Sequence, residues 1–154
     1  VFAQAGAKLA LVSRTADALE AVAAEVRAVG AEALVLPTDV AVEAEVDQAI
    51  DRVVAEWGRV DVLVNNAGTT TFVPHDQLDA LTEDIWLRTL RVNLIGAFMM
   101  SREAAPHIEA AGGGEIVMTS SIASMTANGS SIAYCASKAG MISLTRTLAK
   151  SLGK

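Results

Sequence analysis

A tyrosine and a lysine, Tyr134 and Lys138, stand four residues apart in a segment whose apolar spacing predicts a helix over Ile132–Leu152. On a helix this spacing places both side chains on one face, about one turn apart. A nearby positive charge favours the phenolate and so lowers the pKa of a tyrosine. Such a tyrosine can give a proton to an alcohol oxygen, or take one from it, near neutral pH. The pair therefore suggests proton transfer at a hydroxyl or carbonyl group.

Two further polar residues accompany this pair. Ser121 lies thirteen residues before Tyr134 and follows an apolar run that predicts a strand over Glu115–Thr119. Asn93 lies inside a long helical pattern, where asparagine is an unfavourable residue and must find hydrogen-bond partners. We therefore expect Asn93 to satisfy free backbone groups at a helix bend.

Four segments that include these residues resemble the motifs of the short-chain dehydrogenase/reductase family. They are Asp61–Gly68, Val92–Phe98, Ile116–Ser121 and Tyr134–Lys138, and together they follow the family's order and spacing over nearly the whole chain. The resemblance implies an NAD(P)-dependent oxidoreductase that moves a hydride between nicotinamide and a carbonyl carbon. It implies that Tyr134 is the general acid/base, and that Lys138 lowers its pKa and hydrogen-bonds the nicotinamide ribose.

The resemblance also gives roles to Ser121 and Asn93. Ser121 would polarise the substrate carbonyl and stabilise developing negative charge, whereas its neighbour Ser120 would bond to the backbone. Asn93 would hold a water molecule that links Lys138 to solvent as a proton relay. This relay and a structural role at a helix bend are compatible, so both remain open.

Residues at the predicted strand ends resemble the family's contacts with the adenosine and ribose of the cofactor. Asn66, Ala67 and Gly68 would pass close to the ribose, because small residues allow that approach. Asp39 would hydrogen-bond the adenine amino group and Val40 would supply a backbone contact. The alternative role for Asp39 is a helix cap.

Ser13 and Arg14 bear on the choice between NADP and NAD. An acidic residue at the end of that strand would bind the ribose hydroxyls and repel a 2′-phosphate, but Ser13 stands there. The guanidinium of Arg14 can pair with a 2′-phosphate. We therefore expect NADP, with NAD as the second choice.

Predicted strands and helices alternate along the chain. The strands are 7–13, 33–36, 60–65 and 115–119, and the helices are 16–29, 43–57, 82–111 and 132–152, the third of them bent near Asn93, Gly96 or Pro106. This alternation predicts an α/β fold with helices on both faces of a parallel sheet, the three-layer Rossmann-type doubly wound sheet. The candidate site residues follow the carboxyl ends of the strands, where such sheets bind ligands.

The family's first strand and its Gly-rich turn have no counterpart here, and Val1–Ala7 resembles the end of the helix that follows that turn. We therefore expect a single partial domain over residues 1–154, without the first and last strands of the sheet. The first strand lies at the centre of the family's sheet, so the strands around Ala10 and Val64 would each have an unpaired edge. We expect this chain alone to be unstable or to aggregate. Two alternatives to an enzyme remain: a non-catalytic remnant, and a nucleotide-binding regulator, which would not need Tyr134 and Lys138.

Composition excludes several other classes of function. The 154 residues fit one domain, and with 52% hydrophobic but only 4% aromatic residues the core is aliphatic. A net charge of −6 argues against nucleic acid as a partner, and two histidines with a single cysteine make no convincing metal site. Neither a signal peptide nor a membrane-spanning segment is recognisable, so we expect a cytoplasmic protein with a small-molecule substrate. The resemblance further implies a homotetramer.

Overall fold

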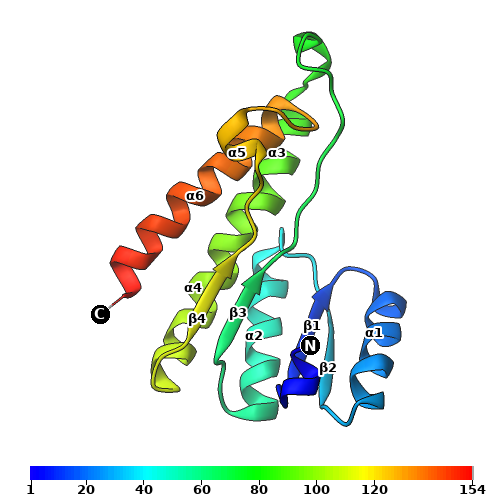
Figure 1. Cartoon of the computed structure of the whole chain (residues 1–154), viewed down its shortest axis with the longest axis vertical. Coiled ribbons are helices and arrows are strands. Elements are labelled where there is room, and N and C mark those ends of the chain that lie inside the picture. Colours follow the sequence, from blue (N-terminus) through cyan, green and yellow to red (C-terminus); the bar gives the residue numbers. More distant parts are fainter. Residues whose placement is uncertain (154) are drawn as a thin grey trace.

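The structure is a computed structural model that describes residues 1–153. Four strands alternate with helices in the described chain, and Figure 1 shows their arrangement. The elements are η1 (Ala3–Ala5), β1 (Leu9–Ser13), α1 (Ala16–Ala28), β2 (Ala33–Pro37), α2 (Glu43–Trp57), β3 (Val62–Asn65), η2 (Leu78–Ala80), α3 (Glu83–Leu90), η3 (Arg91–Gly96), α4 (Ala97–Ala110), β4 (Glu115–Met118), α5 (Ala123–Thr126) and α6 (Ile132–Leu152).

The strands form two separate parallel pairs. β1 pairs with β2, with Leu9 opposite Ala33, and β3 pairs with β4, with Val62 opposite Glu115. Within residues 1–153, β1 and β3 each have one unpaired edge, and the two strands lie side by side in Figure 1 with no strand between them. The predicted incomplete Rossmann-type sheet is thereby confirmed, including the absence of its central strand.

Helix α2 joins the two strand pairs through one aliphatic core. Its buried residues recur at helical spacing, so they form one apolar face. That face packs with residues of β2, β3 and α4; the buried members of the cluster are Leu36, Val46, Ala49, Ile50, Val53, Val60, Leu63, Met99, Met100, Ala104 and Ile108. α1 packs on the β1–β2 pair with Leu19, Ala23 and Val26 buried.

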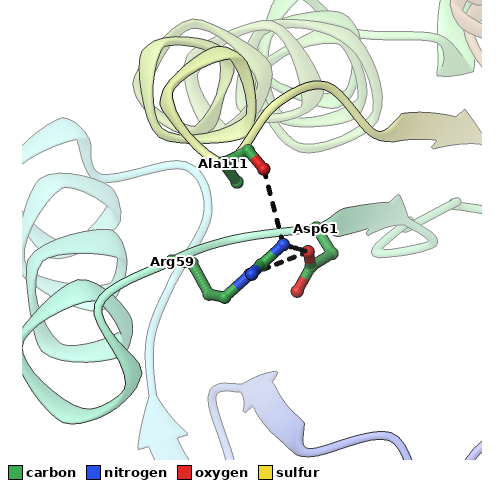
Figure 2. A network of polar contacts seen from close by, with 3 residues as sticks. All are labelled: Arg59, Asp61 and Ala111. Carbon is green, nitrogen blue, oxygen red and sulfur yellow. Dashed lines mark hydrogen bonds and ion pairs between the residues drawn. The ribbon is translucent and has the colours of Figure 1, made fainter.

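Polar contacts fix the beginning of β3 against the end of α4. Arg59 donates to Oδ1 of Asp61 from Nε at 3.0 Å and from Nη2 at 2.5 Å, and Nη2 also reaches the carbonyl of Ala111 at 3.5 Å (Figure 2). Glu115 N donates to the carbonyl of Asp61 at 3.0 Å, which starts the pairing of β4 with β3. At Gly114 an added Cβ would overlap that same carbonyl oxygen, so only glycine fits there without a backbone shift.

The long helix predicted over 82–111 is interrupted at Asn93 and Gly96. Between α3 and α4 the backbone forms one π-helical segment, η3, which contains both residues, whereas Pro106 lies within the continuous α4. π-Helical turns inside α-helices are rare and are frequently found at functional sites. Gly96 also brings η3 into contact with the loop after β2, since an added Cβ would lie 2.7 Å from the carbonyl oxygen of Val40.

The other predicted elements agree with the structure to within a few residues. α2 and α6 have the predicted bounds, while β1 and β3 begin two residues later than predicted. The short helix α5 and the 3₁₀ turn η2 were not predicted, whereas the 3₁₀ turn η1 lies inside Val1–Ala7, the segment that resembles the end of a helix. Among residues 1–153, no helix is both long and apolar enough to cross a membrane.

Candidate active site

Asn93 links the loop after β3 to helix α6. Its side chain is fully buried, Oδ1 accepts from the backbone N–H of Thr69 at 2.7 Å, and Nδ2 donates to the carbonyl of Thr69 at 2.9 Å. Nδ2 also donates to Oγ of Ser137 at 3.0 Å. The structural role expected for Asn93, satisfying backbone groups at a helix bend, is therefore present.

Helix α6 begins immediately before the tyrosine. Ser131 is its N-cap residue, and Oγ of Ser131 accepts from the backbone N–H of Tyr134 at 3.2 Å. Oγ of Ser137 donates to the carbonyl of Tyr134 at 2.7 Å, which connects the first turn of α6 to the contacts of Asn93. The position of Tyr134 is thus set by two buried serines.

Lys138 lies one turn further along α6 and is almost completely buried, with 5% of the residue exposed. Its Nζ donates to the carbonyl of Thr119 at 2.7 Å and lies 5.9 Å from the centroid of the Tyr134 ring. Burial lowers the pKa of Lys138, because an ammonium group loses hydration in the interior. The predicted pairing of a phenol with a nearby lysine on one helix face is present.

Gly68 lies beside both Lys138 and Asn93. An added Cβ at Gly68 would stand 3.8 Å from Nζ of Lys138 and 3.5 Å from Oδ1 of Asn93. The missing side chain therefore leaves free space next to the lysine. The loop that ends β3 meets helix α6 at Lys138.

Ser121 follows β4 and is half-buried. Its Oγ accepts from the backbone N–H of Ala123 at 3.2 Å, and its carbonyl accepts from Oγ of Ser124 at 2.5 Å. The hydroxyl of Ser121 donates no hydrogen bond to another group among residues 1–153. Ser120 donates to the carbonyl of Lys138 at 3.1 Å, so its predicted bond to the backbone is present.

Helix α5, which starts after Ser121, packs against the beginning of α6. Gly129 lies in this contact, because a Cβ there would meet Ala123 Cβ at 3.0 Å and the Tyr134 ring at 3.3 Å. The loop after β3 joins the same region. Val73 N donates to the carbonyl of Ser130 at 2.8 Å, and His75 Nε2 lies 3.1 Å from the carbonyl oxygen of Gly129.

A large cavity of about 1120 Å³ lies between β1 and β3 and extends to their carboxyl ends. Seven of the residues expected to contact the cofactor line this one cavity: Ser13, Arg14, Asp39, Val40, Asn66, Ala67 and Gly68. They come from three separate strand ends, those of β1, β2 and β3. Of the other two, Lys138 adjoins the cavity at Gly68, whereas Tyr134 is not among the residues that line it.

Asp39 shapes the turn between β2 and α2. Its Oδ1 accepts from the backbone N–H of Ala41 at 2.9 Å, and its own N–H donates to the Glu45 carboxylate at 2.6 Å. The N-cap residue of α2 is Val42, so Asp39 is not the helix cap that we considered as its alternative role. Asn65, by contrast, faces inward and donates to Oγ of Ser101 at 3.0 Å.

The motifs did not identify three residues that hold the site together. Thr69 and Ser137 bind both ends of the Asn93 amide, and Arg91 donates from Nε to the carbonyl of Ala41 at 2.8 Å. Ser137 lies three residues after Tyr134, on the same helix face, and that spacing was a usable signal. Neither Thr69 nor Arg91 carries any such signal, because their contacts join segments far apart in the sequence.

Comparisons with known proteins agree with this geometry. A family model described as short chain dehydrogenase matches residues 1–154. D-threitol dehydrogenase of Mycolicibacterium smegmatis is 38% identical over 152 residues, which are 99% of this chain and 57% of that protein. The chain spans about half the length of the curated relatives that it matches.

Two solved structures are also similar. An NAD+-bound xylitol dehydrogenase has a TM-score of 0.91 at 34% identity, over 97% of this chain and 57% of that chain. A metagenomic short-chain oxidoreductase in complex with NADP has a TM-score of 0.90 at 33% identity, over 98% of this chain and 66% of that chain. Both similarities extend over nearly all of the chain.

Proposed function

This chain belongs to the short-chain dehydrogenase family, and on that premise we propose that it carries the proton-transfer site of an NAD(P)-dependent oxidoreductase acting on a small carbonyl or alcohol substrate. The observation that carries the proposal is the buried lysine beside the tyrosine. Nζ of Lys138 lies 5.9 Å from the centroid of the Tyr134 ring, and Asn93 and Lys138 are both buried beside Gly68. Burying an ammonium group is costly, so a role in the chemistry accounts better for this placement than stability does.

The cavity fits a nicotinamide dinucleotide in its chemistry. Glycine at position 68 leaves space beside Lys138, and the strand ends offer acceptors at Asp39 and donors at Arg14 and Asn66. Those residues would hold the ribose and adenosine parts. When bound, the dinucleotide supplies the hydride chemistry.

Tyr134 transfers the proton that accompanies the hydride. During reduction its phenolic proton moves to the carbonyl oxygen, and the resulting phenolate is stabilised by the ammonium group of Lys138. During oxidation the phenolate takes the proton back from the alcohol. Ser121 donates a hydrogen bond to the same substrate oxygen and stabilises the negative charge that develops on it.

Asn93 and Lys138 return the proton to Tyr134. The side-chain amide of Asn93 holds the loop at Thr69, which keeps the space beside Nζ of Lys138 open. A water molecule in that position would connect the lysine to solvent, as the family resemblance implies. Asn93 is thus both a structural residue and part of the relay.

We favour NADP over NAD as the cofactor. Arg14 follows β1 directly after Ser13, lines the cavity, and has no ion pair among residues 1–153. A free guanidinium at this position suits a 2′-phosphate, and no carboxylate at position 13 repels it. An Arg14→Ala protein that keeps its NADPH affinity would contradict this assignment.

The assembly that we propose is a homotetramer in the cytoplasm. α3, α4 and α6 carry exposed apolar side chains, including Leu87, Phe98 and Leu152, which are 58%, 41% and 45% exposed. Large exposed apolar patches mark protein–protein interaction sites, and we assign these side chains to the subunit interfaces. The single free cysteine, Cys135, suits a reducing compartment.

One observation favours a non-catalytic alternative for the 154 residues taken alone. The unpaired edges of β1 and β3 border the cavity, so no strand lies between them to support a bound nucleotide. The fluorescence of NADPH on addition of the purified protein distinguishes the enzyme from the non-catalytic remnant. Enhanced fluorescence that a Tyr134→Phe variant retains, while losing turnover, supports the enzyme; unchanged fluorescence supports the remnant.

A further inference from the structure

We propose that Arg88 of α3 forms part of the wall that binds the adenine of the cofactor. The proposal rests on the cofactor binding proposed above and adds a residue that the motifs do not include. Three observations carry it: the distribution of paired and unpaired cations around the cavity, the helix face on which Arg88 lies, and the hydrogen-bonding groups opposite it.

Two of the cationic side chains on the cavity wall are already paired. Lys8 forms an ion pair with Glu32 at 2.8 Å, and Arg59 forms one with Asp61 at 2.5 Å. Lys8 precedes β1 and Arg59 precedes β3, so both stand at the amino ends of the strands. Their charges are compensated within the protein.

The other two cations on the wall of the cavity, Arg14 and Arg88, are unpaired. Neither side chain has a hydrogen bond or an ion pair with another residue in the described range 1–153. Arg14 directly follows the carboxyl end of β1, and Arg88 lines the cavity together with Gly68 and Thr69 at the carboxyl end of β3. The free positive charge of the cavity therefore lies at the end where parallel sheets bind ligands.

Arg88 lies on the helix face that touches the Asp39–Val40 loop. Arg88, Val92 and Gly96 follow each other at spacings of four residues, which places them along one side of the α3–η3 helix. Gly96 brings this side against Val40, where an added Cβ would lie 2.7 Å from the carbonyl oxygen. Arg88 and Val92 line the cavity together with Asp39 and Val40. Arg88 is thus the residue of α3 that lines the cavity on the helix side facing this loop.

A hydrogen bond holds the loop and the helix together. Nε of Arg91 donates to the carbonyl of Ala41 at 2.8 Å, next to the contact of Gly96 with Val40. The contacts of Arg91 and Gly96 lie at the two ends of η3, which directly continues α3. Together they fix the distance between this helix and the loop. The guanidinium of Arg88 is therefore carried by a helix whose position relative to Asp39 is set by the protein.

The chemistry of Arg88 and Asp39 is complementary to adenine. The base has an amino group that donates hydrogen bonds and ring nitrogens that accept them. A carboxylate at Asp39 accepts from the amino group, and a guanidinium donates to a ring nitrogen or stacks on the ring face. Arg14, which follows Ser13 at the end of β1, is the residue assigned to the ribose phosphate, so the two arginines bind different parts of the nucleotide.

Binding measurements with three nucleotides test this assignment. The Kd values of NADPH, NADH and reduced nicotinamide mononucleotide are measured by fluorescence titration for Arg88→Gln, Arg14→Gln and the wild-type protein. We expect Arg88→Gln to raise the Kd of NADPH and NADH by the same factor, about tenfold, because both contain adenine. The mononucleotide lacks adenine, so its Kd should stay unchanged. Arg14→Gln should raise the Kd of NADPH more than the Kd of NADH.

Arg52→Gln is the matched control, because Arg52 is an exposed arginine of α2 outside the cavity and should change none of the three affinities. Unchanged NADPH and NADH affinities in Arg88→Gln would overturn the proposal, and so would a loss confined to NADPH, which would indicate a phosphate contact. Arg88→Lys keeps the charge without the planar guanidinium and should lose part of the affinity; it carries the test if the glutamine variant does not fold. A wild-type protein that binds none of the nucleotides would instead overturn the proposed function.

Discussion

The side-chain amide of Asn93 donates a 3.0 Å hydrogen bond to the hydroxyl of Ser137, which itself donates to the carbonyl of Tyr134 at 2.7 Å. Asn93 and Ser137 have no exposed surface. The other atoms of the Asn93 amide are bound to the backbone of Thr69. One buried chain of hydrogen bonds therefore connects the loop after β3 to the backbone of the tyrosine.

Replacing Ser137 with alanine should destabilise the protein. The substitution removes the buried acceptor of one Asn93 N–H, and an unsatisfied buried donor costs about 1–3 kcal/mol. We expect the free energy of unfolding, measured by urea titration, to fall by that amount. Ser143→Ala is a control on the exposed side of the same helix and should have little effect. Equal losses in the two variants would show that the hydrogen-bond chain contributes nothing specific.

The stability of the protein should rise with pH in the alkaline range because of Lys138. Burial lowers the pKa of Lys138 from its ordinary value of 10.5. Between the lowered pKa and 10.5 the unfolded chain binds more protons than the folded one, so the free energy of unfolding increases as the pH rises. In Lys138→Met this increase should disappear, together with turnover.

Denaturant titrations at a series of alkaline pH values measure this slope directly. Lys150→Met, which changes an exposed lysine in the last turn of α6, is the control and should keep the wild-type slope. If Lys138→Met has the same slope as the wild-type protein, the burial of the lysine does not govern its titration.

The sequence predicted the architecture and most site positions for physical reasons that can be named. Apolar runs and helical spacing depend on local patterns, and so α2 and α6 were predicted with their observed bounds. Asn93 was identified because a buried polar residue inside a helix needs partners. Its partners, Thr69 and Ser137, remained unknown, because hydrogen bonds across 24 and 44 positions leave no local pattern.

Contacts that depend on a close approach of two backbone segments could also not be predicted from the sequence. Nothing in the sequence around Gly96 indicates that it touches the carbonyl of Val40, although the residue was noted as a site of bending. The short helix α5 lacks a periodic pattern because it has only four residues. The role of Arg88 likewise depends on the cavity, and a single arginine on a helix surface carries no signal by itself.

Replacing Gly114 with alanine should destabilise the β3–β4 pair strongly. The new Cβ would overlap the carbonyl oxygen of Asp61, which accepts the first hydrogen bond between the two strands. Overpacking of this kind costs about 1–3 kcal/mol, and displacement of the backbone adds to it. We expect a loss of about 3 kcal/mol or more in the free energy of unfolding, and Ala110→Ser at the exposed end of α4 should cost little. A Gly114→Ala protein as stable as this control would mean that the backbone at Asp61 can move freely.

The unpaired edges of β1 and β3 should make the isolated 154-residue chain prone to aggregation. Each edge presents free N–H and C=O groups, and exposed valines of β3 and β4, among them Val64 and Val117, lie close to them. We expect light scattering that grows with protein concentration, and a thermal unfolding transition that broadens as the concentration rises. Val64→Lys places a charge on the exposed face of the edge strand and should reduce the scattering, whereas Val29→Lys, at the end of α1 and similarly exposed, should not. A cooperative transition of a monomer that persists at high protein concentration, observed by calorimetry and confirmed by sedimentation, would show that the two strand pairs do not associate through their unpaired edges.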